Sequence, residues 1–325
     1  LLIRWDKHCG IYDNIRQRHS RFISLKVEVD GQDASGRTIL LKMVEGIMVM
    51  RRMLTLALCA VLALGLLVAA AGCGGGEQET KQFKVGLECG YAPFNWTQAD
   101  DSNGAVPISG TNQYAGGYDV EIAKRIAEGL GRELVIVKTS WKGLPPAVQA
   151  GTIDAIIAGM SPTAERQKTL DFSDPYYRSE LVMVVKKGSP YENATSIQDF
   201  AGAKITAQLN TFHYTVIDQI NGVQKQTAMD DFPAMRVALE SGIIDGYVSE
   251  RPEGISASAA NPNFVMVEFA EGKGFEASDE DVAVAVGLKK GNPDLEKINE
   301  ILATISEEER IRLMDEAISN QPSAQ

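Results

Sequence analysis

The chain has 325 residues, enough for two domains that each bury a core of their own. It carries 43 Asp and Glu against 32 Lys and Arg, a formal net charge of −11, and this acidity argues against nucleic acid as a partner. The sequence contains no phosphate-binding P-loop and no His-Glu metal motif, so we expect no cofactor and no metal. Neither metal-site nor disulfide-framework spacing is found among the four cysteines, which are Cys9, Cys59, Cys73 and Cys89.

The first 49 residues do not have the pattern of a domain. The segment opens on Leu rather than Met, holds two of the three histidines and shows poor hydrophobic periodicity. We expect residues 1–49 to be translated upstream sequence, with the true start near Met50; a short disordered extension is the alternative.

Residues 50–72 have the pattern of a secretion signal. Met50-Arg51-Arg52 is basic, residues 54–71 are an apolar run, and Ala70-Ala71-Gly72 leads into Cys73. Small residues directly before a cysteine resemble a bacterial lipoprotein signal, although Ala70 stands where Leu is usual. Cys73 is then the lipidated N-terminus, and residues 73–80 form a flexible tether. The alternative is an uncleaved membrane helix, and both place the rest of the protein outside the cytoplasm.

The body begins with a strand, a loop and a helix. Residues 83–88 alternate like a strand, and the aromatic residues Tyr91 and Trp96 follow at its carboxyl end. Residues 97–114 are polar and Gly-rich, as in a surface loop or hairpin. A helix is predicted from Gly117 through Leu130, and a second strand over residues 134–137.

The stretch WKGLPPAVQAGTIDAIIAGMSPTAERQ, which starts at Trp141, organises the chain. It predicts a helix over residues 143–150 that stops at Gly151, and then a buried strand over residues 153–159. Ser161-Pro162 predicts the start of a second helix. A helix N-terminus at the carboxyl end of a strand favours an anion, and Arg166 can add a bidentate fork for a carboxylate.

The same pattern recurs at residues 233–252, where a helix stops at Gly242 and an Asp-led strand follows. We interpret Asp154 and Asp245, which begin the two strands, as structural. The second strand ends at Glu250, so one strand end offers a cation and the other an anion. If the two ends face each other, the pair suits a zwitterion such as a free amino acid.

The remaining elements predict two α/β units joined by two crossings. We expect strands at residues 181–185, 203–207, 227–229, 264–267 and 281–288, and helices at residues 197–200, 211–220, 293–305 and 307–318. The strand at 181–185 and the return strand at 281–288 are the candidate crossings. This assigns residues 81–185 and 279–325 to a first lobe and residues 186–278 to a second.

Four sequence motifs within residues 81–318 resemble those of the extracellular solute-binding proteins of family 3, the amino-acid receptors of ABC importers. They are YAPFNW, GYDVEIAKRIAEGLG, LPPAVQAGTIDAIIAGMSPTAERQ and LDFSDPYY. The resemblance implies an α/β, two-lobed, periplasmic-binding-protein-like (type II) fold with two strands crossing between the lobes. It also implies a membrane permease as partner, and a monomer is expected.

The resemblance further implies a ligand site. Ser161 and Arg166 match the family's carboxylate clamp, and Thr211 matches the second lobe's backbone contact to that carboxylate. Glu250 matches the acidic anchor of the α-ammonium group, which is usually Asp. Ala158 matches the position whose backbone carbonyl helps to hold the ammonium.

The other matched positions concern the ligand's side chain and the clamp loop. Gly159 follows Ala158, and many relatives have Ser at these two places. Tyr91 and Trp141 match an aromatic pair that sandwiches the ligand side chain. Glu88 matches an Asp used by relatives that bind cationic amino acids.

The sequence therefore predicts a lipid-anchored, extracytoplasmic receptor for a polar L-amino acid, with arginine or lysine expected first. Glutamine, cystine and histidine are alternatives. An enzyme of the same fold, a cyclohexadienyl-type dehydratase, is the rival from another class, because Glu88 or Glu250 could serve as its general acid. The sensor half of a signalling receptor is a third candidate, which no kinase segment or second membrane segment in the sequence supports.

Overall fold

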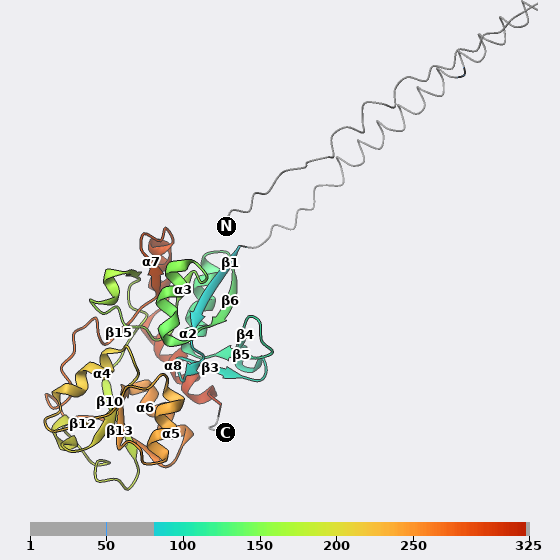
Figure 1. The fold of residues 1–325 in the computed structure, drawn as a ribbon. Helices are drawn as coiled ribbons and strands as arrows, with labels where there is room; N and C mark the ends of the chain where they lie inside the picture. Colours follow the sequence, from blue (N-terminus) through green and yellow to red (C-terminus); the bar gives the residue numbers. More distant parts are fainter. Residues whose placement is uncertain (1–49, 51–80, 323–325) are drawn as a thin grey trace, which may run out of the picture. The chain divides into compact units, whose positions relative to one another are not determined.

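The computed structural model describes Met50 and residues 81–322 (Figure 1). The predicted extension (1–49), the signal after Met50 and the tether (73–80) lie outside the described residues. Within the described part of the chain, no helix combines the length and apolarity needed to cross a membrane.

The first lobe is built on a five-stranded sheet. Its strand order is β6-β1-β7-β16-β8, in which β1 is parallel to β6 and β7, whereas β16 is antiparallel to β7 and β8. The strands are β1 (Gln82–Leu87), β6 (Glu133–Lys138), β7 (Ala155–Ile156), β16 (Gly287–Lys289) and β8 (Leu170–Phe172). The helices of this lobe are α2 (Tyr118–Gly129), α3 (Leu144–Ala150), α7 (Leu295–Ala303) and α8 (Glu307–Asn320). The two C-terminal helices, red in Figure 1, pack on α2 although some 170 residues separate them in sequence.

The second lobe has its own five-stranded sheet, in the order β12-β11-β13-β10-β14. The strands are β12 (Gln224–Lys225), β11 (Lys204–Thr206), β13 (Gly246–Glu250), β10 (Leu181–Lys186) and β14 (Phe264–Val267). Helices α5 (Phe232–Glu240) and α6 (Arg251–Ala260) pack against one group of these strands. A separate apolar cluster contains Phe200 and Ile217, which come from the segments around α4 (Phe212–Val216).

Smaller elements complete the described chain. Strands β2 (Gly90–Tyr91), β3 (Asn95–Gln98), β5 (Tyr114–Gly116) and β4 (Val106–Pro107) form an antiparallel sheet in the first lobe. Gln98 pairs with Tyr114, so residues 97–114 form a long hairpin, one of the two predicted forms. Short 3-10 helices occur at Ser102–Gly104, Trp141–Gly143, Arg166–Lys168, Ile197–Phe200 and Ile217–Gln219.

The crossing between the lobes lies earlier than the sequence pattern predicts. Strand β10 pairs antiparallel with β13 and β14, so residues 181–185 belong to the second lobe and are not a crossing. The chain passes between the sheets at β9 (Tyr177–Arg178) and returns at β15 (Ala283–Val284), and these two strands pair with each other. The β-branched residues at 181–185 predict a strand whether it crosses between the lobes or belongs to the second sheet, because periodicity does not reveal which strand it pairs with.

The predicted repeat is present as a repeated hydrogen-bond pattern. In the first lobe the carboxylate of Asp154 accepts from the backbone N–H of Lys84 at 2.8 Å, and the backbone N–H of Asp154 donates to the Lys84 carbonyl at 2.7 Å. In the second lobe Asp245 makes the same two bonds with Lys204, each 2.8 Å. Each aspartate therefore joins the loop before its strand to the start of the neighbouring strand, as the structural interpretation expected.

We predict that Asp154→Ala and Asp245→Ala each lower the free energy of unfolding by about 1 kcal/mol, because each loses one hydrogen bond to a strand N–H. Urea denaturation followed by circular dichroism measures this. Because the two sites are in different lobes, the double variant should lose about the sum of both. The control is Asp174→Ala: this exposed side chain has no hydrogen bond or ion pair to other described residues, so its removal should change stability by less than about 0.5 kcal/mol. An equal loss in the control would contradict the prediction.

Candidate functional site

Arg166 follows strand β7, but the helix predicted from Ser161 does not form. Residues 161–165 are irregular, and only the 3-10 helix Arg166–Lys168 comes after them. The chain then enters β8, where Leu170 pairs with Lys289 of β16. Ser161 is buried but does not cap an α-helix, and the predicted anion site on helix N–H groups is therefore not built here.

The guanidinium of Arg166 joins the two lobes through carbonyl oxygens. Its Nη1 donates to the Ser161 carbonyl at 2.8 Å, and its Nη2 donates to the Asn210 carbonyl of the second lobe at 3.0 Å. The guanidinium carbon lies 5.0 Å from the centre of the Trp141 ring. Burial lowers the pKa of Arg166 to about 10, partly opposed by attraction to Asp281 and Glu250, so the group stays charged at neutral pH. No carboxylate of the described chain forms an ion pair with it, which leaves a charge free for an external anion.

Gly159 has a conformation and a neighbour that both require glycine. Its φ is +62°, and a Cβ atom there would lie 2.6 Å from Cε1 of Tyr91. Its backbone N–H donates to the hydroxyl of Tyr176 at 3.3 Å. A serine at this position would need the Tyr91 ring to move. Ala158 is fully buried in the core of the first lobe.

A buried polar network holds two loops of the first lobe in place. Asp119, fully buried, accepts from the Tyr176 hydroxyl at 2.7 Å and from Asn95 Nδ2 at 2.8 Å. Asn95 in turn accepts from the backbone N–H of Cys89 at 2.8 Å. Burial raises the pKa of Asp119 to about 6, partly opposed by these hydrogen bonds. The network thus fixes the Gly159 loop through Tyr176 and the turn at Cys89 through Asn95.

The second lobe presents the end of strand β11 and the start of α4. Thr211 precedes α4 and is buried, and its hydroxyl donates to the Gln208 carbonyl at 2.7 Å rather than capping the helix. The backbone N–H of Thr211 and that of Phe212 thus stand at the helix start, where an anion is favoured, although α4 has only five residues.

Glu250 and His213 form a buried pair at the end of strand β13. The exposed fraction is 1% for Glu250 and 6% for His213, and Nε2 of His213 lies 3.4 Å from Oε1 of Glu250. Neither carboxylate oxygen and neither ring nitrogen has a hydrogen-bond partner in the described structure. Arg251, the neighbour that could have held Glu250 in a surface ion pair, instead pairs with Glu268. Glu250 is therefore a buried acid whose polar neighbours are the His213 ring and the Tyr91 hydroxyl. No lysine or arginine of the described chain pairs with it, and a buried acid without such a partner is costly.

A small pocket between the lobes, here called the interlobe pocket, brings most of these groups together. Its lining residues are Tyr91, Trp141, Gly159, Ser161, Arg166, Gln208, Thr211, Phe212, His213 and Phe232. The volume open to the centre of a water molecule is only about 10 Å³, room for roughly one water. Ala158 and Glu250 are not in the lining, but Glu250 contacts it through His213. The lobes are thus closed on each other, and a ligand needs them to open.

Four lining residues were not predicted: Gln208, Phe212, His213 and Phe232. Gln208 and His213 flank Thr211 in a polar segment at a strand end, which is the signal that could have identified them. Phe232 begins α5 behind its capping residue Asp231, a position where an aromatic residue is ordinarily core.

The predicted aromatic sandwich of Tyr91 and Trp141 is not the arrangement observed. The Tyr91 ring stacks on Phe94, with ring centres 4.9 Å apart, and on Phe232 of the second lobe, at 4.3 Å. The Arg166 guanidinium instead packs over the Trp141 ring. Both residues line the interlobe pocket, but protein groups already cover the faces that a ligand side chain would use. The Tyr91 hydroxyl is buried without a partner.

Glu88 lies beside the interlobe pocket rather than in it. It lines an adjoining cavity of about 470 Å³, here called the side cavity, together with Trp141, Asp230 and Asp231. Both carboxylate oxygens accept from Nε2 of Gln208 at 3.1 Å. Burial raises the pKa of Glu88 to about 7, an effect that the Gln208 bond opposes and Asp231 strengthens. The amide of Gln208 therefore separates Glu88 from the interlobe pocket.

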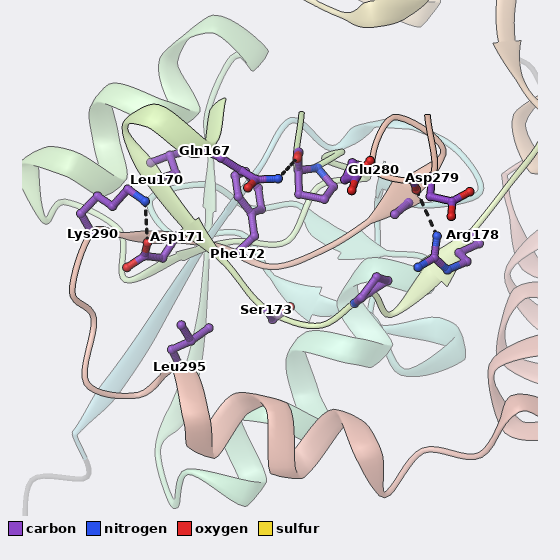
Figure 2. Close-up of a pocket in the computed structure, with 13 residues that line it drawn as sticks. Gln167, Leu170, Asp171, Phe172, Ser173, Arg178, Asp279, Glu280, Lys290 and Leu295 are labelled. Atoms are coloured by element: carbon purple, nitrogen blue, oxygen red, sulfur yellow. Dashed lines mark hydrogen bonds and ion pairs between the residues drawn. The ribbon is translucent and has the colours of Figure 1, made fainter. Parts of the chain in front are cut away.

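Another pocket, of about 350 Å³, lies on the first lobe next to the β9–β15 crossing (Figure 2). Its two cationic side chains have partners within the protein: Lys290 pairs with Asp171 at 2.7 Å, and Arg178 donates to the Asp279 carbonyl at 3.0 Å. Of the predicted ligand-binding residues, none lines it. The interlobe pocket, not this one, is the candidate site.

Comparison with known proteins agrees with this geometry. The family model for bacterial extracellular solute-binding proteins, family 3, matches residues 83–317. The L-cystine-binding protein TcyJ of Escherichia coli is 30% identical over 71% of this chain and 80% of its own length. A Campylobacter jejuni protein named "probable histidine-binding protein" is 32% identical over 60% of this chain and 71% of its own.

Among solved structures, the amino-acid ABC transporter substrate-binding protein AbpA of Streptococcus pneumoniae, bound to L-arginine, superimposes with a TM-score of 0.62. It is 27% identical, over 73% of this chain and 94% of its own. With a fold of the predicted two-lobed class and a family match across both lobes, this chain belongs to the bacterial extracellular solute-binding proteins, family 3.

Proposed function

We propose that this protein is the substrate-binding component of an ABC transporter and binds a polar L-amino acid, arginine or lysine first, by closure of its two lobes. One observation carries the proposal. A guanidinium and a buried carboxylate stand at one interlobe pocket, on different lobes, and neither has an ion-pair partner of full opposite charge within the described structure. A free amino acid supplies both missing charges.

The carboxylate of the ligand is assigned to Arg166, Ser161 and Thr211. Arg166 now bonds only to two carbonyl oxygens, so a carboxylate can replace weaker partners with a charge-assisted pair. The α-ammonium group is assigned to Glu250. Because the buried carboxylate lacks any donor in the closed form, its cost is offset when an ammonium group enters.

The side chain of the ligand is assigned to the end of the interlobe pocket that borders Glu88 and the side cavity, here called the Glu88 end. Glu88 and Asp231 make the Glu88 end acidic, and Gln208 is the only side chain of the described protein that donates to Glu88. If Gln208 yields its place, a guanidinium or ammonium group meets a carboxylate and reaches the side cavity. A cationic side chain fits this end better than the side chain of glutamine or cystine, and arginine in the S. pneumoniae structure agrees with that choice.

Lobe closure follows from the placement of the two charges. Arg166 belongs to the first lobe and Glu250 to the second, so only a ligand that contacts both favours the closed form. The closed form then docks on a membrane permease. We further propose that Cys73 anchors the monomeric protein by a lipid to the outer face of the cytoplasmic membrane; retention of a Cys73→Ser variant in the membrane fraction would oppose this.

The dehydratase alternative rests on Glu88, whose pKa of about 7 suits a general acid. Turnover of prephenate or arogenate by the purified protein would favour it over the receptor. The receptor is tested by thermal denaturation with each of the twenty amino acids. Arginine or lysine at 100 times its dissociation constant should stabilise the protein by about 2.7 kcal/mol. A response to glutamine or cystine alone would contradict the role of Glu88, and no response to any amino acid would contradict the receptor itself.

Replacing Arg166 by Gln should weaken binding of the preferred amino acid by roughly 10- to 100-fold, because a charge-assisted pair with the carboxylate is worth about 1.5–3 kcal/mol. Isothermal titration calorimetry measures the change. The matched control is Lys168→Gln two residues on, whose exposed side chain pairs only with Glu165 in the described structure. It should leave affinity within about twofold. Equal losses in both variants would show that charge near the pocket, not the Arg166 contact, matters.

A pH dependence is expected at the side-chain end. A cationic side chain favours the ionised form of Glu88, whose pKa is about 7 without ligand, so binding releases a proton and affinity rises with pH until the group is fully ionised. The ratio of affinities for arginine and its neutral analogue citrulline cancels effects at the α-groups. This ratio should rise roughly tenfold from pH 6 to pH 8, and it should stay flat in Glu88→Gln. A flat ratio in the unaltered protein would remove Glu88 from the site.

A further inference from the structure

We propose that His213 determines how the site recognises the α-amino end of its ligand. In its neutral form His213 stands with Glu250 as a second acceptor for a primary ammonium group. In its protonated form it takes Glu250 for itself and excludes that group. This inference rests on the proposed function and adds a residue to which the family resemblance gave no role.

His213 lies between the interlobe pocket and Glu250. His213 lines the interlobe pocket, whereas Glu250 lies outside the lining and meets it through the histidine ring, 3.4 Å away. An ammonium group that approaches Glu250 from the pocket must therefore pass or contact the ring. The Phe212 ring lies against His213 with centres 4.4 Å apart, so the imidazole does not turn freely away.

The unsatisfied hydrogen bonds are the second argument. His213 and Glu250 are both more than nine-tenths buried, and four of their polar atoms lack partners. Buried polar atoms in native proteins are nearly always paired, so this cluster indicates a missing ligand group. A primary ammonium carries three N–H donors. Glu250 can accept one or two of them, and the unprotonated nitrogen of a neutral imidazole can accept another.

The charges around the pair are the third argument. The other ionisable groups that interact with Glu250 are Tyr91, Tyr177, Arg166 and Asp119. Burial raises the pKa of Tyr91 and Tyr177 further above neutrality, and Arg166 stays charged there. Asp119, with a pKa of about 6, titrates in the same range as a histidine, so the test must separate the two.

The experiment compares arginine with 5-guanidinopentanoate, which is arginine without its α-amino group. Both share the guanidinium and the carboxylate, so effects at Glu88 and Arg166 cancel in their affinity ratio. Protonated His213 competes only with a ligand that carries the ammonium group. The preference for arginine, measured by competition calorimetry, should therefore be smaller at pH 5.5 than at pH 7.5, and an equal preference at the two pH values would contradict the proposal.

The matched variant is His213→Gln, which keeps an acceptor and a donor but does not titrate. Its preference for arginine should change less than twofold over the same range, and because Asp119 is present in both proteins, the difference between them belongs to His213. A second readout needs no variant: at pH 6, calorimetry in buffers of different ionisation enthalpy should show arginine releasing more protons than 5-guanidinopentanoate.

The outcomes separate this inference from the proposed function. If arginine binds with the same pH-dependent preference in both proteins, or if the two ligands release equal numbers of protons, the role of His213 is wrong and the receptor stands. If no amino acid binds at any pH, the proposed function fails first. If His213→Gln binds 5-guanidinopentanoate normally but loses arginine at every pH, the histidine is needed for the ammonium contact but is not a competitor, which overturns the second half of the proposal.

Discussion

Two opposite charges that lack counter-charges of their own are the constraint around which this protein is arranged. Arg166 keeps its charge with carbonyl oxygens as partners, and the polar neighbours of buried Glu250 are the Tyr91 hydroxyl and the His213 ring. A protein core normally avoids an unpaired buried charge, because it costs several kcal/mol. Arg166 and Glu250 belong to different lobes and do not bond to each other in the described structure. Under the proposed function, a zwitterion supplies both counter-charges.

The rest of the first lobe serves to hold its half of the site in place. Asp119 is fully buried, and through Tyr176 it fixes the Gly159 loop, while through Asn95 it fixes the turn beside Glu88. Within the described residues the chain passes between the two lobes at the paired strands β9 and β15, a short ribbon about which lobe closure is proposed to occur. The buried hydrogen bonds hold the loops of the first lobe in place before a ligand binds. Under the proposed function, the distance between the binding groups of the two lobes then depends on the ligand.

Much of this could be predicted from the sequence, and the failures have common physical causes. The family, the two-lobed fold and the Asp154 and Asp245 contacts follow from local patterns: a glycine-ended helix, an aspartate and an apolar strand. The helix expected at Ser161 does not form, and the segment instead leads into β8, whose position is set by pairing with β16. The predicted crossing at residues 181–185 was wrong because a strand's own sequence does not reveal which strands it pairs with.

Contacts between the lobes were the least predictable part. Phe232 reaches Tyr91, and Gln208 reaches Glu88, across sequence separations of more than one hundred residues. Single-sequence patterns carry no information about such pairs. His213 could have been noticed as a histidine two residues from Thr211, but its meaning depends on Glu250, which comes from another strand.

In the described structure, groups of the protein itself fill the contacts between the two lobes. Each charged group that is assigned to a cationic amino acid contacts an uncharged or less strongly interacting group of the protein. The Ser161 and Asn210 carbonyls stand where a carboxylate would face Arg166, His213 stands beside Glu250 where an ammonium would, and the amide of Gln208 donates to Glu88 where a cation would. Phe232 covers the Tyr91 ring in the same way. Neutral partners satisfy part of the hydrogen bonding but little of the charge, and charged hydrogen bonds are about twice as strong. Under the proposed function, a ligand that replaces all of these partners at once favours the closed form over the open one.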